Sequence, residues 1–464
     1  MTSRRIFRKF FSTLPNEIVL KLVCVGLILD VLGATPAVSA ARPERPNIIV
    51  IMGDDLGYGD ISPYNGWIET PQLERMAREG VRFTDYHSSG NVCSPTRAGL
   101  MTGRYQQRAG IPGVVVADPK SPVHENGLQD VEFTIAEAFQ AAGYRTGIFG
   151  KWHLGYYPKY NPVRHGFDVF KGYVSGNIDF ISHYDQSGTY DWWHDDETAV
   201  EEGYVTHLID RHALSFIREN KDRPFFLYVP HEAPHYPFQR PGDPGMRSEG
   251  KGRAADWAIQ KGVKLAEIRE RYRLMVEEMD KNVGHVLDLL RELDLHEQTF
   301  VFFCSDNGAA GQWGDNTPLR GAKGSNWEGG HRVPAIAWWP GTISAGTTTD
   351  QLAISLDVMP TMLAVAGLPL PTERSLDGIN LMPALTEGKT VSRELVWNGK
   401  AIRDGDWKMI VDGSGEAEIG LYNLKNDLSE QKNLAEEHPE RVANMQQRLN
   451  RWQQEMAETA TKQP

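Results

Sequence analysis

The chain has 464 residues, of which 40% are hydrophobic and 24% are charged. These fractions are ordinary for a globular protein and exclude a mostly disordered, collagen-like or multi-spanning membrane chain. Its 49 basic and 61 acidic side chains give a net charge of −12, which argues against a nucleic-acid-binding protein that acts through bulk positive charge. Three cysteines are too few for a disulfide scaffold.

The N-terminus is typical of a secretory leader. Four basic residues lie among the first ten, and a short apolar stretch follows at residues 18–32. The small residues at 37–40 then suit a signal peptidase, so we predict a signal peptide over residues 1–40 and export to the periplasm or the extracellular space. The alternatives are lipidation at Cys24 and a short membrane anchor. The anchor is disfavoured because the stretch is short and contains two charges.

Predicted strands and helices alternate after the leader. Strands are predicted at residues 47–52, 81–84, 146–149, 224–229 and 299–304, and helices at residues 71–79, 134–142, 207–217 and 266–293. This alternation predicts an α/β fold, in which helices cover both faces of a large, mostly parallel sheet.

The pattern changes near residue 392. Short antiparallel strands are predicted at residues 394–397, 407–411 and 419–422, and a terminal helix at about 439–456. We therefore predict three parts: the signal peptide (1–40), a catalytic domain (41–390) and a smaller C-terminal α+β subdomain with an antiparallel sheet (391–464).

Polar side chains follow two of the predicted strands. Asp54 and Asp55 follow the first strand, and Asp306 and Asn307 follow the strand at 299–304. Ligand sites in open α/β sheets lie beyond the carboxyl ends of the strands, and two adjacent carboxylates are costly there without a cation. We predict an all-oxygen site that suits Ca²⁺ or Mg²⁺. The alternatives are a solvated turn at Asp54 and Asp55 and a hairpin-type turn at residues 306–308.

Cys93 precedes a predicted helix. Ser94 and Pro95 are typical of a helix start, so the Cys93 side chain would lie at the positive end of the helix dipole, where an oxyanion is stabilised. Arg97 would add a fork of hydrogen-bond donors. Taken alone, an isolated cysteine is more often inert and half-buried, and a disulfide with Cys304 is also open.

The segment from Cys93 to Arg104 reads Cys-x-Pro-x-Arg-Ala-x-Leu-x-Thr-Gly-Arg. It resembles the signature of the type I sulfatases, which belong to the alkaline-phosphatase-like superfamily. The resemblance covers nearly all of the chain after the leader, through residues 53–55, 150–155, 233–237, 305–308, 320–324, 328–330, 421–424 and 433–435. The chain looks like a bacterial carbohydrate sulfatase.

The resemblance implies a modified cysteine and a metal. Cys93 would be converted to Cα-formylglycine by a formylglycine-generating or sulfatase-maturing enzyme, which disfavours a disulfide with Cys304. One hydroxyl of the hydrated aldehyde attacks sulfur and the other later expels sulfate. One Ca²⁺ would be held by the following residues: Asp54, Asp55, Cys93, Asp306 and Asn307.

The resemblance also assigns catalytic roles. Arg97, Lys151 and Lys323 would place positive charge around the sulfuryl oxygens. His153 would accept the proton of the second hydroxyl, and His235 would protonate the leaving oxygen, a task that Lys323 could share. The role of His231 stays open, and His331 is interpreted as structural.

The substrate is harder to predict. Residues 176–194 are rich in aromatic and polar side chains, which suit a sugar ring. Four of them are candidates for sugar hydroxyls: Asn177, His183, Asp185 and His194. The alternative is an ordinary loop that is packed by its tryptophans, and a lipid, steroid or aryl sulfate remains open as substrate.

The sequence thus favours an exported, calcium-dependent enzyme that removes sulfate from a sulfated carbohydrate. One alternative is a phosphonate monoester or phosphodiester hydrolase that uses the same formylglycine. Another is a non-catalytic polyanion-binding protein with an unmodified Cys93. We expect no nucleic-acid partner and no stable membrane anchor.

Overall fold

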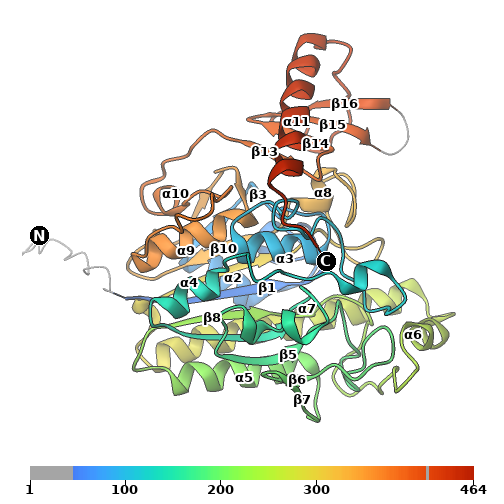
Figure 1. Ribbon diagram of the computed structural model, residues 1–464, viewed down its shortest axis with the longest axis vertical. Helices are drawn as coiled ribbons and strands as arrows, with labels where there is room; N and C mark the ends of the chain where they lie inside the picture. The colour runs from blue at the N-terminus through green and yellow to red at the C-terminus, as the bar shows by residue number, and fades with distance from the viewer. Residues whose placement is uncertain (1–44, 414–416, 464) are drawn as a thin grey trace, which may run out of the picture. The chain divides into compact units, whose positions relative to one another are not determined.

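A ten-stranded sheet forms the centre of the computed structural model, which describes residues 45–413 and 417–463 (Figure 1). The predicted signal peptide lies outside these residues. In spatial order the strands are β11 (Thr347–Thr349), β2 (Val81–Phe83), β10 (Ala335–Trp338), β9 (Thr299–Ser305), β1 (Asn47–Gly53), β8 (Phe225–Pro230), β4 (Arg145–Lys151), β5 (Val169–Tyr173), β6 (Trp193–His194) and β7 (Glu197–Thr198).

The middle of this sheet is parallel. Strands β9, β1, β8, β4 and β5 all run in one direction, whereas β10 and β6 are antiparallel to their neighbours. Gly53 at the end of β1 lies opposite Ser305 at the end of β9, and Met52 lies opposite Pro230 of β8. The predicted mostly parallel sheet is therefore confirmed. Its register brings the carboxyl ends of four strands to one edge.

Helices cover both faces of the sheet, as predicted (Figure 1). On β1, Ile48 and Val50 pack on one side and Ile49 and Ile51 on the other, as expected of a strand that is buried on both faces. One side is covered by α3 (Cys93–Thr102), α4 (Ile135–Ala141) and α9 (Val358–Ala366). The other side is covered by α2 (Pro71–Glu79), α5 (Val205–Glu219) and α7 (Leu265–Glu292).

Shorter elements complete the main part of the chain. They are β3 (Tyr86–His87), which pairs with β12 (Ala353–Ile354), and the helices α6 (Arg253–Gln260), α8 (Glu328–His331) and α10 (Met382–Glu387). Nowhere in residues 45–413 and 417–463 is a helix both long and apolar enough to cross a membrane.

The C-terminal part holds the predicted antiparallel sheet. Its strands are β13 (Glu394–Trp397), β14 (Ala401–Asp404), β15 (Trp407–Gly413) and β16 (Ala417–Asn423), followed by α11 (Pro439–Thr459). Met409 packs against Leu449 of α11, whereas Trp397 and Ile410 pack with Leu356 of the main part. The described residues form one compact unit, and the domain boundary at residue 391 stays a prediction.

A buried ionic cluster links the small sheet to α8. Lys408 of β15 has no exposed surface, and its Nζ lies 2.9 Å from both Glu328 Oε1 and Glu430 Oε1. The backbone N–H of Glu328 also donates to Glu430 Oε2 at 2.7 Å. Because α8 follows directly after the segment that carries Lys323, this cluster holds that segment in place.

We expect Lys408→Met to destabilise the protein. The substitution leaves the carboxylates of Glu328 and Glu430 buried side by side, and removing one partner of a buried ion pair costs about 3–5 kcal/mol. Burial already raises the pKa of Glu430, so this residue can take up a proton, and the loss should lie near the lower end. The free energy of unfolding, measured in urea, gives the size of this loss.

Lys432→Met is the control, because Lys432 is 67% exposed beside Glu437 and such exposed ion pairs contribute little to stability. Equal stability of the two variants would contradict the prediction.

Candidate active site

The carboxyl ends of four parallel strands supply most of the predicted site residues. Those that directly follow or end these strands are Asp54 and Asp55 after β1, Asp306 and Asn307 after β9, Lys151 and His153 at the end of β4, and His231 and His235 after β8. These residues come from positions up to 253 apart in the chain, and the parallel register gathers them at one edge.

Cys93 lies at the start of α3. It is the first residue of this helix, which therefore begins within one residue of the predicted start. Cys93 is 3% exposed. Both cysteines in the described part of the chain are free thiols. Lys323 and Tyr156 lie close enough to Cys93 to interact with it electrostatically. The thiol is therefore held at a helix N-terminus beside a cation, where a developing anion is stabilised.

Three ion pairs lie at the strand ends, of which the two made by Lys151 and Arg97 are buried and the one made by Lys323 is partly exposed. They join Lys151 Nζ to Asp54 Oδ2 at 2.5 Å, Arg97 Nη2 to Asp306 Oδ2 at 2.8 Å, and Lys323 Nζ to Asp55 Oδ1 at 2.5 Å. The formal charges of these six side chains cancel. A divalent cation added to the set would make the site net positive, which favours an anionic substrate.

The pKa values of these groups reflect their partners. Burial raises the pKa of Asp55, but the charges of Lys323 and His235 outweigh burial and hold it below its ordinary value. The pKa of Asp306 is raised by burial and by the charge of Asp54. Burial lowers the pKa of Lys323, but Asp55 more than compensates and raises it above the usual range. Lys323 therefore carries its proton at neutral pH.

The acidic residues fit a hard cation. Asp55 Oδ1 accepts a hydrogen bond from Asn307 Nδ2 at 2.7 Å, and the backbone N–H of Asp55 donates to Asp306 Oδ1 at 3.2 Å. Three of the predicted ligands are therefore in contact. The buried oxygens Asp54 Oδ1 and Asn307 Oδ1 find no hydrogen-bond partner among the described residues. Unpartnered, buried oxygens next to carboxylates suit Ca²⁺, which prefers oxygen ligands.

His153 has one ring nitrogen bound and one open. Its backbone is left-handed (φ 57°), and Nε2 lies 2.8 Å from the carbonyl oxygen of Val115, to which it donates. The buried Nδ1 has no partner in residues 45–413 or 417–463. Burial, followed by the charge of Lys151, holds the pKa of His153 well below its ordinary value. The ring is thus neutral, and Nδ1 presents a lone pair.

His235 is oriented by its own loop. Its Nδ1 donates to the carbonyl oxygen of Tyr236 at 2.7 Å, and its Nε2 lies 3.7 Å from Asp55 Oδ2. Burial lowers the pKa of His235 well below its usual value, against the opposing charge of Asp55. His231 is also buried, and burial lowers its pKa to about 3. His331 lies outside this group, in contact with the Lys408 cluster.

The candidate substrate residues are engaged in other contacts. Asn177 Oδ1 accepts a hydrogen bond from Arg247 Nη2 at 2.7 Å, and His183 Nε2 donates to the Gly203 carbonyl at 2.9 Å. Asp185 Oδ1 accepts from the backbone N–H groups of Ser187 and Thr189. His194 Nε2 lies 2.9 Å from Glu201 Oε2. The first three residues are buried, and His194 belongs to a separate cluster with Glu201 and His212. A role for them in sugar binding stays a prediction.

Sequence reasoning missed two groups at the site. The carbonyl of Val115 orients His153 but carries no side-chain signal. Glu232 is fully buried and accepts from the backbone N–H of Ile178 at 2.8 Å, and burial raises its pKa well above the usual value. Its position between His231 and Ala233, directly before the family motif at residues 233–237, could have drawn attention to it.

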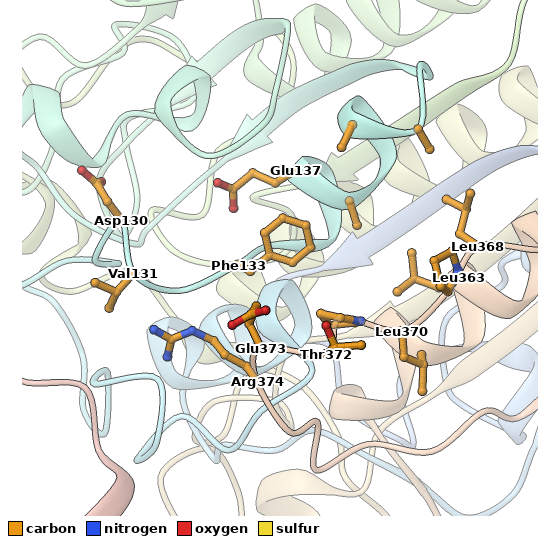
Figure 2. A pocket seen from close by; sticks show the side chains of 15 residues that line it. Asp130, Val131, Phe133, Glu137, Leu363, Leu368, Leu370, Thr372, Glu373 and Arg374 are labelled. Atoms are coloured by element: carbon orange, nitrogen blue, oxygen red, sulfur yellow. The ribbon is translucent and has the colours of Figure 1, made fainter.

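An apolar pocket of about 690 Å³ is separate from this site. It is lined by α4, by Phe133 and by the segment from Leu368 to Arg374, and its charged side chains include Glu137 and Glu373 (Figure 2). None of the residues that line it is a predicted site residue.

Comparison with known proteins identifies the family. The family model described as Sulfatase matches residues 46–368. The chain belongs to the sulfatase family. A second family model, described as N-sulphoglucosamine sulphohydrolase, C-terminal, matches residues 323–458 of this sulfatase. The protein is therefore a sulfuric ester hydrolase of the alkaline-phosphatase-like fold.

Relatives of known activity are similar to this sulfatase over most of its length. The N-acetylgalactosamine-6-sulfatase of Rattus norvegicus is 35% identical over 393 residues, which cover 80% of this chain and 71% of the relative. The human protein of the same name is 35% identical over 380 residues and covers 77% and 69%. The crystal structure of Ps i-CgsB in complex with k-i-k-neocarrahexaose superposes with a TM-score of 0.78 at 28% identity, covering 90% of this chain and 95% of the other.

Proposed function

We propose that this sulfatase removes sulfate from a sulfated carbohydrate, with formylglycine formed from Cys93 and one bound Ca²⁺. The observation that carries the proposal is that Cys93 begins α3, the helix whose Arg97 pairs with both Asp306 and Asp54. Of the predicted ligands, Asp54 Oδ1 and Asn307 Oδ1 have no hydrogen-bond partner among the described residues. The names of the relatives support the substrate class, because they include an N-acetylgalactosamine-6-sulfatase and a protein crystallised with k-i-k-neocarrahexaose.

Cleavage of a sulfate ester needs a nucleophile, stabilisation of charge on the sulfuryl oxygens and a proton for the leaving alcohol. Hydrated formylglycine at position 93 would supply an oxygen nucleophile. Ca²⁺, held by the four predicted oxygen ligands, would supply positive charge toward the sulfuryl oxygens. Arg97 and Lys151 hold the carboxylates Asp306 and Asp54 in place.

Two histidines and a lysine handle the protons. His153 keeps Nδ1 open, so this atom can accept a proton from residue 93 when sulfate leaves. Lys323 carries a proton at neutral pH and can donate it to the leaving oxygen. Nε2 of His235 must first take up a proton before it can share this task, because the proton of the neutral ring lies on Nδ1. General acid–base groups of this kind need an atom within hydrogen-bond reach of the reacting oxygen.

We expect His153→Ala to slow sulfate release by about 10²–10⁴-fold, the usual contribution of a general base. Steady-state turnover of a sulfated oligosaccharide measures the loss. His165→Ala is a matched control, because His165 is a buried, neutral histidine whose pKa burial lowers to about 4 and which the site does not use. A similar loss in both variants would mean that His153 acts only through packing.

The proposed function is tested by sulfate release, read by ion chromatography. The protein is co-expressed with a formylglycine-generating enzyme, supplied with Ca²⁺, and given sulfated galactans, glycosaminoglycan fragments and an aryl sulfate. Release from a carbohydrate that vanishes in Cys93→Ala supports the proposal. Preferred turnover of phosphonate monoesters or phosphodiesters would favour the alternative hydrolase. Binding without turnover, with a free thiol at Cys93, would favour the polyanion-binding protein.

The proposal also includes export and maturation. The basic and apolar leader at residues 1–40 supports secretion to the periplasm or beyond. Because sulfated polysaccharides are large, polar polymers, an enzyme that acts on them must meet them outside the cytoplasm. The N-terminal sequence of the secreted protein, and the mass of the peptide that contains Cys93, test the two statements.

A further inference from the structure

A second group of metal-binding side chains lies at the β6 edge of the large sheet. His194 ends β6, His212 lies on α5, and Glu201 precedes that helix. The Nε2 atom of His194 lies 2.9 Å from Glu201 Oε2, and the Nε2 atom of His212 lies 2.9 Å from Glu201 Oε1. Two imidazoles from different elements thus converge on one carboxylate. Their ligand atoms all lie within 4.8 Å of one another.

We propose that His194, Glu201 and His212 bind a divalent transition metal such as Zn²⁺. Imidazole and carboxylate are ligands that Zn²⁺ accepts, and its tetrahedral sites with bonds of about 2.0–2.1 Å hold the ligand atoms about 3.3 Å apart. Starting from 2.9 Å, the distance from each imidazole nitrogen to the carboxylate oxygen need grow by only about half an ångström to reach that spacing. Each ring would then carry its proton on Nδ1.

The surroundings of Glu201 support a metal site. Trp192 Nε1 donates a hydrogen bond to Glu201 Oε2 at 2.7 Å. In metal centres, hydrogen bonds of this kind orient the carboxylates that bind the ion. The His194 side chain is 36% exposed, so an ion can enter from solvent and keep water as a fourth ligand. Arg211 also contacts Glu201, but it is 58% exposed and can turn into solvent when the cation binds.

The other histidine cluster shows why exposure matters. His87, Glu328 and His331 have the same types of ligand at similar spacing. They are fully buried, and the amine of Lys408 lies 2.9 Å from Glu328. A buried lysine cannot leave to make room for a second cation, because an unpaired buried charge is costly. The cluster at His194 is free of this obstacle.

A metal at this position would have a structural role. The β6–β7 hairpin forms the end of the ten-stranded sheet and is joined to β5 by two register pairs and by the hydrogen bonds between Asp195 and Phe170. An ion bound by His194 and His212 would fasten this hairpin to α5. A ligand that binds only the folded state raises stability, so Zn²⁺ should protect this edge from unfolding.

Isothermal titration of Zn²⁺ into the untagged, Ca²⁺-saturated protein tests the proposal. The wild type should bind Zn²⁺ at a site whose affinity falls by about tenfold or more in His194→Ala and in Glu201→Gln, since even loss of a supporting group costs that much. Arg211→Ala should bind at least as tightly as the wild type, because a competing cation is gone. Zn²⁺ should raise the unfolding temperature of the wild type more than that of Glu201→Gln.

His207→Ala is the matched control. His207 lies on the same helix, half-exposed, with Nε2 2.9 Å from Glu278 Oε2, and its loss should leave Zn²⁺ binding unchanged. The proposal is overturned if wild type and His194→Ala bind Zn²⁺ equally. It is also overturned if Arg211→Ala loses binding, because the group would then be an ion-pair cluster. Circular dichroism of each variant establishes that it is folded.

Discussion

Cys93→Ser is expected to end turnover and to leave a stable sulfate ester on the protein. A serine hydroxyl at the start of α3 can attack sulfur, but serine lacks the second hydroxyl that would expel the sulfate. Each molecule should therefore react once with a good substrate. Intact-protein mass spectrometry should show the gain of one SO₃ unit, while ion chromatography shows no continuing release of sulfate.

Two control variants test this interpretation. Cys93→Ala should give neither turnover nor adduct. Cys304→Ser replaces the other buried thiol, on β9, whose pKa burial raises to about 12, and it should keep turning over. A Cys93→Ser protein that continues to turn over would overturn the proposed role of formylglycine. Turnover without any formylglycine in the wild-type peptide would do the same.

Removal of Ca²⁺ by a chelator should lower kcat/KM by about three orders of magnitude or more, because a bound cation supplies several kcal/mol of charge stabilisation in the transition state. Re-addition of Ca²⁺ should restore activity. Asn307→Ala removes a predicted uncharged ligand whose Oδ1 finds no partner in the described chain. This variant should raise the Ca²⁺ concentration needed for half-maximal activity. Activity measured against free Ca²⁺ gives the shift.

Asp280→Asn is a suitable control for the metal. Asp280 is a buried carboxylate on α7 that accepts from the backbone N–H groups of Gln72 and Leu73. Its substitution should lower stability but leave the Ca²⁺ dependence unchanged. Full activity of the wild type in chelator would contradict the metal site, and an equal response to Mg²⁺ would contradict the choice of Ca²⁺.

The central strands could be predicted because a strand buried on both faces is a continuous apolar run. Residues 47–52 and 299–304 are such runs, and they form most of β1 and β9. Strand β5 was missed because it holds Lys171 and a glycine among its five residues. Strand β14 was missed because it contains only two apolar residues, which are followed by Arg403 and Asp404.

The candidate site could be predicted in its residues but not in its contacts. Asp54, Asp306 and Lys151 stand directly at strand ends, so the general rule for open sheets points to them. The pairing of Lys323 with Asp55 depends on how the loop after β9 folds back, which no local pattern specifies. Likewise, the tautomer of His153 depends on a backbone carbonyl of Val115.

The burial of Cys93 sets a time limit on its chemical modification. The thiol is 3% exposed, and every residue of α3 is buried with it, so a modifying enzyme must reach the motif before folding closes over it. Strand β1 pairs with β9, which ends at Ser305; at synthesis rates of about 5–20 residues per second, that strand emerges on the order of ten seconds or more after Cys93. Under the proposed maturation of Cys93, the relative rates of modification and folding would decide the fraction of active enzyme. Slower translation of the segment between Cys93 and β9 should raise that fraction without any change in the protein sequence.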